Sequence, residues 1–240
     1  MLGPVLFNYF VSDCPVQQPS YADDITISHS AADIEEIERR LQSDIDAIEA
    51  WAQRKDLVIA PTKSTITLFT PDRARQSQLH PNVTISGVRI PLDKNPRVLG
   101  VVLDTHFCFH KHVEEVVKSC KKKLGILRAL AGTGWGCQKE LLLKTWKVYI
   151  EPKMNYAAGI WSVNSSDAAF KEIQKVKNSA MRIATGCHSN TQLSHLLSES
   201  KLLPAKAHAN LLSSQLLARA LVPSHPSHAV VTAPHGPRSM

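Results

Sequence analysis

Residues 21 to 28 read Tyr-Ala-Asp-Asp-Ile-Thr-Ile-Ser, a strand-like stretch that two adjacent aspartates interrupt. Neighbouring carboxylates in a strand are costly unless something offsets their repulsion and desolvation, and a hard divalent cation does so most directly. The flanking residues place Asp23 and Asp24 at the bend of a hairpin. An isolated Asp-Asp dipeptide is most often a surface turn, so its interpretation depends on the sequence around it.

The segments that follow the aspartates predict an α+β fold. A helix is expected from residue 34 to residue 54, because apolar residues recur at helical spacing after a capping-box-like Ser30 and Asp33. β-rich segments are expected next: Asp56–Ala60, Thr62–Phe69, Val83–Ile85, Val88–Ile90 and Val98–Leu103.

Helices are expected to dominate after about residue 110. The predicted ones are 113–130, Gln138–Ile150, Asp167–Thr185 and Ala205–Leu221, and Trp135, Trp146 and Trp161 are predicted to lie in the core. The last stretch, 223–240, is rich in Pro, His and Ser and is expected to be a disordered tail. The predicted organisation is therefore 1–110, 111–222 and 223–240.

Charge divides the chain in the same place. Residues 1–110 carry a net charge of −4, whereas residues 111–240 carry +11. An acidic front that gathers cations and a basic back that lies along a polyanion would give this split, because phosphate neutralisation and counterion release drive such binding. Basic helix faces that only keep the protein in solution would give it equally well, so both interpretations stay open.

Composition excludes several classes of protein. No run approaches the ~18 to 20 consecutive apolar residues of a membrane helix, and no secretory signal is recognisable, so an intracellular protein is expected. The five cysteines form no CxxC pair, which indicates neither a disulfide framework nor a zinc knuckle. His106, His110 and His112 have no matching Cys or acid spacing and are predicted to be surface residues.

The tetrapeptide at residues 21–24 resembles the metal-binding motif of reverse transcriptases, and its surroundings resemble those of the non-LTR retrotransposon group, the LINE and jockey-like elements. Upstream, Leu2-Gly3-Pro4-Val5-Leu6-Phe7-Asn8 with Asp13 and Pro15 is similar to the family's LSPxLFNxYxxDxP segment, with Gly3 where Ser is usual.

Downstream blocks resemble the same family in the expected order. Trp51 to Leu57 and Pro61 to Phe69 look like the motif whose lysine acts as a proton donor. Leu99 to Asp104, followed by Phe109 and His112, resembles the block that seats the primer. Finally, 156–161 and 176–186 look like the helical region that follows the polymerase palm. The similarity runs from about residue 1 to residue 220.

The resemblance implies the rear half of a polymerase palm, a small antiparallel sheet plus a helix, followed by an all-helical thumb-like region. It implies RNA-directed DNA synthesis with two Mg²⁺ ions and with an RNA template, a DNA primer and dNTPs as substrates. No membrane partner is expected, because the chain has no long apolar run. The implied metal-binding residues are Asp23 and Asp24, which are catalytic together with Lys63; the implied primer or nucleic-acid contacts are Tyr21, Leu99, Gly100, Val101, Lys121, Lys122 and Lys123.

Two departures qualify these implications. The family's third metal-binding aspartate and its fingers region would precede Met1, so we expect a fragment that is inactive alone and that a separate N-terminal half could complete. The alternative is a non-catalytic nucleic-acid-binding remnant that uses only the basic helices. Lys63 could also be an ordinary strand-edge lysine, and Lys121 to Lys123 a solvated helix face.

Overall fold

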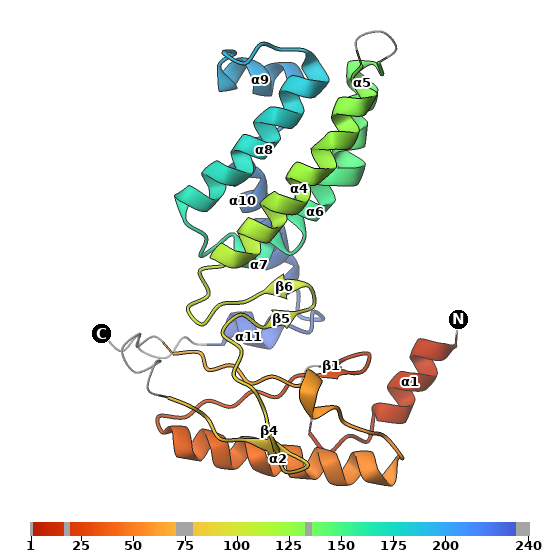
Figure 1. Ribbon diagram of the computed structural model, residues 1–240, viewed down its shortest axis with the longest axis vertical. Helices are drawn as coiled ribbons and strands as arrows, with labels where there is room; N and C mark the ends of the chain where they lie inside the picture. The colour runs from red at the N-terminus through yellow and green to blue at the C-terminus, as the bar shows by residue number, and fades with distance from the viewer. Residues whose placement is uncertain (1, 17–19, 71–78, 133–135, 234–240) are drawn as a thin grey trace. The chain divides into compact units, whose positions relative to one another are not determined.

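The computed structural model of the protein describes residues 2–16, 20–70, 79–132 and 136–233. These form two compact units, Met1–Pro96 and Arg97–Met240. Both contain helices; of the described two-stranded antiparallel sheets, two lie in the first unit and one in the second (Figure 1). The predicted combination of helices with small antiparallel sheets is therefore confirmed.

The first unit begins with helix α1, Gly3–Val11, and a short hairpin of β1, Ser20–Tyr21, and β2, Asp24–Ile25. Helix α2, Ile34–Arg54, has the predicted bounds. Its N-cap is Asp33, whose side chain accepts a hydrogen bond from the Glu35 N–H at 3.3 Å. Ser30 is thus not the cap, because the carboxylate of Asp33 already stands one residue before the first helical residue.

A small core fills the space between α2 and the second hairpin of this unit. Strands β3, Thr84–Ile85, and β4, Val88–Arg89, join through Ser86 and Gly87, both with positive φ, as a two-residue hairpin loop requires. The Gln42 side chain of α2 satisfies the backbone of β3, accepting from Thr84 N at 2.9 Å and donating to Thr84 O at 3.1 Å. The buried residues of this core are Ile45, Val83, Ile85 and Ile90.

The predicted strands Asp56–Ala60 and Thr62–Phe69 are wrong. Residues Pro61–Lys63 form a short 3-10 helix, η1, and the following segment contributes a single parallel bridge between Ile66 and Leu92. Pro61 fixes its own φ and lacks an N–H donor, which favours the first position of a helical turn over a strand. Ile59 and Ile66 of this segment pack against the small core, and only Ile66 also has a bridge partner.

The second unit begins with a hairpin where a single strand, Val98–Leu103, was predicted. Strand β5, Arg97–Val98, pairs with β6, Val101–Val102. Leu99 and Gly100 turn the chain between them with φ of 46° and 80°. Because Gly100 has no Cβ, it adopts this left-handed conformation without the steric cost that other residues meet.

Helices make up the rest of this unit, and the predicted ones are confirmed. They are α4, His110–Leu130; α5, Lys139–Thr145; the π-helical turn η2, Trp146–Ile150; α6, Glu151–Asn155; α7, Ala158–Trp161; α8, Asp167–Thr185; α9, Leu193–Ser200; α10, Ala205–Ala220; and α11, His228–Thr232. Figure 1 shows α4 and α8 side by side. Within the described residues, no helix is both long and apolar enough to cross a membrane.

A large apolar core lies among these helices. It includes Cys120 and Leu127 of α4, Trp146 of η2 and Trp161 of α7, all buried, so the core prediction is confirmed for both tryptophans; Trp135 lies outside the described residues. Burial raises the pKa of the Cys120 thiol to about 11, so this cysteine packs as a protonated, apolar side chain.

One ion pair is enclosed in the helical unit. The Lys177 ammonium of α8 donates to Glu151 Oε1 at 3.3 Å, and Lys177 is almost completely buried. Glu151 Oε1 also lies 3.3 Å from His208 Nδ1 of α10. Burial is the largest influence on Lys177 and lowers its pKa, and the neighbouring carboxylate opposes that shift.

Candidate active site

The two adjacent aspartates lie at the tip of the β1–β2 hairpin. Tyr21 pairs with Asp24 across the strands, so Ala22 and Asp23 form the two-residue turn. Ala22 has a φ of 54°, a conformation that a tight hairpin turn requires. Both carboxylates are exposed, while Ile27, just beyond the hairpin, packs against the core of the first unit. The predicted placement of the pair at a hairpin bend is confirmed.

Exposed carboxylate oxygens at a turn suit a hard cation. Mg²⁺ is commonly bound through one or two carboxylates, with waters and substrate phosphates completing the octahedron. Within the described part of the chain, no group of three or more His, Cys, Asp or Glu side chains could hold a metal ion. Asp23 and Asp24 are thus two exposed carboxylates of the type that contributes one or two ligands to a hard cation.

Asp13, which belongs to the motif upstream of the aspartate pair, is bound by residues at the end of α2. It follows α1, and its carboxylate accepts from Trp51 Nε1 at 3.1 Å and binds the Lys55 ammonium at 2.9 Å. The hydrogen bond from Lys55 is the largest of the influences that lower the Asp13 pKa. The chain after α1 is thereby attached to the end of α2.

Lys63 ends the η1 turn and is exposed. The hydroxyl of the next residue, Ser64, donates to Ala60 O at 3.2 Å and closes the turn. Among the described residues, no hydrogen bond joins Lys63 to either aspartate. The backbone of Lys63 therefore lies on a hydrogen-bonded turn of the same unit as the carboxylate pair, and its side chain is exposed.

The β5–β6 hairpin presents Leu99 at its turn, with its side chain about half exposed. Val101 is buried, and its side chain belongs to the core of the helical unit. Two residues outside the hairpin bind its backbone: the Tyr156 hydroxyl donates to Leu99 O at 2.7 Å, and Val102 N donates to His112 Nδ1 at 3.3 Å. Of the three predicted contacts that lie on this hairpin, Leu99 and Gly100 form the turn, and Val101 is the first residue of β6.

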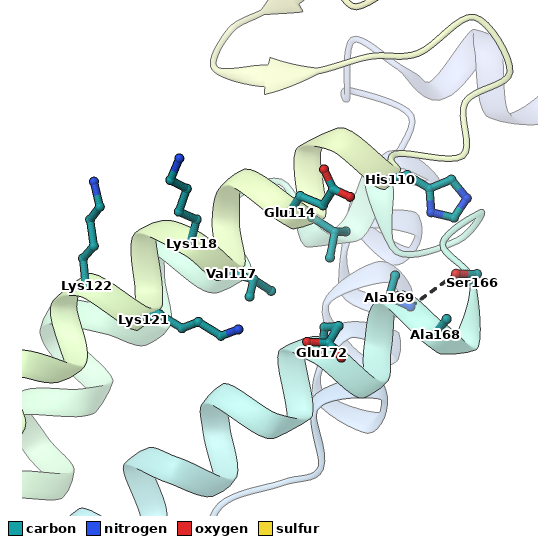
Figure 2. A pocket seen from close by; sticks show the side chains of 11 residues that line it. His110, Glu114, Val117, Lys118, Lys121, Lys122, Ser166, Ala168, Ala169 and Glu172 are labelled. Carbon is teal, nitrogen blue, oxygen red and sulfur yellow. Dashed lines mark hydrogen bonds between the residues drawn. The ribbon is translucent and has the colours of Figure 1, made fainter.

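The three consecutive lysines of α4 are not equivalent. Lys121 and Lys122 are exposed, and with Lys118 they line a groove of about 780 Å³ between α4 and α8. Figure 2 shows Lys121 extending between the two helices, whereas Lys118 and Lys122 point away from α8. Lys123 instead donates to Tyr149 O at 2.9 Å, and its ammonium lies 4.0 Å from the centroid of the Tyr149 ring.

Acidic residues share the groove. Glu114 and Glu172 line it beside the lysines, and Glu172 also binds Lys175 one turn along α8 at 2.5 Å. The hydrogen bond from Lys175 is the largest influence that lowers the Glu172 pKa, with a smaller contribution from Lys121. Since a polyanion would approach these carboxylates too, the outward-pointing Lys118 and Lys122 suit phosphate contacts best.

Three curated relatives resemble the chain over most of its length. It is 25% identical over 199 residues to the probable RNA-directed DNA polymerase from transposon BS of Drosophila melanogaster, covering 78% of this chain and 22% of that protein. It is 26% identical over 196 residues to the probable RNA-directed DNA polymerase from transposon X-element of the same species, covering 78% of this chain and 21% of that protein. It is also 25% identical over 189 residues to the RNA-directed DNA polymerase from mobile element jockey of Drosophila funebris, covering 74% of this chain and 20% of that protein.

The resemblance to reverse transcriptases of non-LTR retrotransposons is confirmed. The chain spans about a fifth of the length of the curated relatives it matches. No family model matches it, and no solved structure matches it.

Three residues have structural roles that neither the sequence pattern nor the resemblance to reverse transcriptases predicted. His112 was predicted to be a surface residue, but it is buried and accepts the Val102 hydrogen bond. Asp104 binds the loop before α4, accepting from the backbone N–H groups of His106, Cys108 and Phe109. Tyr156 binds Leu99 across a long separation in sequence. Asp104 alone carried a local signal, since an aspartate that precedes a helix commonly binds nearby N–H groups.

The side chain of Tyr21 lies outside the described residues, so its predicted position near the primer end stays a prediction. Its backbone is described: Tyr21 is the last residue of β1 and the partner of Asp24.

Proposed function

We propose that this chain supplies one part of the active site of an RNA-directed DNA polymerase, in which a primer 3′-hydroxyl attacks the α-phosphate of a deoxynucleotide. The observation that carries the proposal is the β1–β2 hairpin, which presents Asp23 and Asp24 as exposed neighbours at its tip. Similarity to RNA-directed DNA polymerases over three quarters of the chain supports it. The substrates are an RNA template, a DNA primer and dNTPs.

In this proposal Asp23 is the principal metal ligand and Asp24 the supporting one. The chemistry that two Mg²⁺ ions supply in such a site is activation of the attacking hydroxyl and stabilisation of the leaving oxygen. Lys63 holds a proton at Nζ and donates it to the leaving group. Tyr21 lies near the primer end, and Leu99, Gly100 and Val101 seat the primer strand.

A second candidate function is non-catalytic nucleic-acid binding by the helical unit. The groove between α4 and α8, with Lys118, Lys121 and Lys122 along it, favours this candidate. Nucleic-acid binding by the helical unit requires neither Asp23 nor Asp24. The two functions therefore differ in their dependence on the carboxylate pair and on magnesium.

Retention of a labelled dNTP separates the two candidates. We expect the chain, saturated with a primed RNA template, to retain the dNTP when Mg²⁺ is present and to lose it on chelation or in an Asp23→Asn, Asp24→Asn variant. The template itself should stay bound in every case. Template binding with no magnesium-dependent dNTP retention would favour the non-catalytic function.

The 240 residues by themselves are expected to extend no primer. The described residues offer a cation two carboxylates from one hairpin, whereas in-line displacement needs both cations held firmly. A polypeptide that supplies the third carboxylate, such as an N-terminal half of the polymerase, is the partner we propose. Template-dependent extension by the chain alone, abolished by Asp23→Ala, would contradict the expected inactivity while supporting the site.

A further inference from the structure

The β5–β6 hairpin is too short to hold its own conformation. Each strand has two residues, and isolated two-stranded hairpins are at best marginally stable in water. Its turn also contains a non-glycine residue, Leu99, with a φ of 46°. The conformation of the tip must therefore depend on contacts from outside the hairpin.

Tyr156 provides one such contact. It lies between α6 and α7, and its hydroxyl donates to Leu99 O at 2.7 Å. Its ring also lies along the turn: a Cβ added to Gly100 would be 3.6 Å from Tyr156 Cε1. Tyr156 thus supports both residues of the tip.

His112 provides the second contact, from the first turn of α4. Val102 N donates to its Nδ1 at 3.3 Å, so Nδ1 carries no proton and the neutral ring carries its proton on Nε2. The ring is buried, 6.0 Å from the Trp161 ring between centroids. Only a neutral imidazole can accept this hydrogen bond.

The surroundings of His112 keep it neutral. Burial is the largest cause that lowers its pKa from the ordinary 6.5, followed by the positive charge of Lys153 on α6. Glu115 on α4 raises the pKa and Arg97 on β5 lowers it, and these two bind each other at 2.5 Å. Protonation of Nδ1 would place a donor against the Val102 N–H donor.

We propose that His112 and Tyr156 are positioning residues that fix the β5–β6 hairpin so that its Leu99–Gly100 tip binds the primer strand of a primer–template duplex. The proposal rests on the proposed polymerase function. It assigns no chemical step to either residue. Both act on the primer through the backbone of the tip.

The test measures binding of a primed RNA template whose primer carries a fluorescent base at its 3′ end, from about pH 5 to about pH 8, the range in which histidines titrate. Binding and the 3′-end signal should weaken as the pH falls below the ordinary His112 pKa, because protonation breaks the Val102 bond. In His112→Asn, whose Oδ1 can accept the same bond, both should be nearly independent of pH. His112→Leu should bind weakly throughout the range.

Tyr156→Phe isolates the other contact without removing the ring. Loss of one neutral hydrogen bond predicts binding weaker by roughly two- to tenfold, with a changed 3′-end signal. Tyr149→Phe is the matched control, because its hydroxyl makes no hydrogen bond with a described residue. Amide hydrogen exchange at residues 99–102, measured without nucleic acid, should accelerate in Tyr156→Phe and stay unchanged in the control.

Two outcomes separate this inference from the function on which it rests. If the wild-type chain binds the primed template, but Tyr156→Phe and His112→Leu match it at every pH, the positioning roles are wrong and the proposed function stands. If the wild-type chain binds no primed template at any pH, both are wrong. His112→Asn keeps the test decisive even if His112→Leu does not fold. Normal affinity of His112→Asn at every pH requires a folded protein and can be compared directly with the wild-type pH profile.

Discussion

At the scale of single residues, the enclosed Lys177–Glu151 pair makes an asymmetric prediction. Glu151→Gln leaves a buried ammonium without a negative partner, which should lower the free energy of unfolding by about 3 kcal/mol. Lys177→Met replaces the ammonium with an apolar chain of similar length, and Glu151, whose side chain is 13% exposed, keeps His208 Nδ1 at 3.3 Å, so this change should cost less. Urea denaturation followed by tryptophan fluorescence measures both. A larger loss in Lys177→Met would contradict the buried-charge account.

The same lysine predicts a pH dependence. Because the folded-state pKa of Lys177 is below its ordinary 10.5, its contribution to stability is complete above pH 10.5 and is lost as the pH falls through the folded-state value. Relative to Lys177→Met, the wild-type protein should therefore gain stability as the pH rises into the alkaline range. If the stabilities of the two proteins changed with pH in parallel, burial would not lower the pKa of Lys177.

Single residues also show where sequence is insufficient. The carboxylate pair was predictable, because Asp23 and Asp24 interrupt a strand pattern and a two-residue turn follows from that. The burial of His112 was not, since it depends on a bond to Val102 and on the Trp161 ring, which a one-dimensional pattern does not reveal. Lys123 and Lys122 are neighbours of one type, yet only Lys123 lies against Tyr149.

At the scale of elements, the start of α4 depends on a residue outside the helix. Its N-cap, Phe109, has a φ of 58° and no side-chain cap, whereas Asp104 accepts three backbone N–H groups in the preceding loop. Asp104→Ala should lower the free energy of unfolding of the helical unit by roughly 2 kcal/mol, since three partly buried N–H donors lose a charged acceptor. Hydrogen exchange should accelerate at residues 106–113.

Asp93→Ala is the control for that change. Asp93 accepts from Asn95 N at 2.9 Å in the first unit, a single bond of the same type. Its effect should be smaller and should leave exchange in α4 unchanged. Equal effects of the two substitutions on α4 would mean that Asp104 does not order the start of the helix.

Elements with local boundary signals were predictable to the residue. Helix α2 starts after its Asp33 cap. Helix α8 starts after Ser166, whose hydroxyl accepts from Ala169 N, and ends at Thr185, just before its C-cap Gly186 with a φ of 69°. The expected strands between Asp56 and Phe69 were wrong because a strand needs a run of paired residues, and in this segment only Ile66 pairs, with Leu92; local propensity does not supply the other partners. The β5–β6 turn was missed because Leu99 is an unusual residue at positive φ.

At the scale of the whole molecule, the basic charge of the helical half and the outward direction of Lys118 and Lys122 predict a contact with nucleic acid along α4. Lys118→Gln with Lys122→Gln should weaken binding to RNA or DNA and reduce the slope of log affinity against log salt by about 0.9 for each phosphate that the variant no longer neutralises. Arg39→Gln, an exposed change on the acidic first unit, should alter neither. Anisotropy titrations at several salt concentrations measure the slopes. An unchanged slope in the double variant would exclude this face of α4 as a backbone contact.

The central claim is that Asp23 and Asp24 bind the catalytic cations, and paramagnetic line broadening by Mn²⁺, a substitute for Mg²⁺, tests it most directly. We expect amide signals of residues 22–25 to broaden at the lowest Mn²⁺ concentrations and to recover in Asp23→Asn, Asp24→Asn. The adjacent acids Glu35 and Glu36 are the internal control, because Glu36 is already bound to Arg39 and Arg40. Broadening that favours α2, or that persists at the hairpin in the double variant, would contradict the claim.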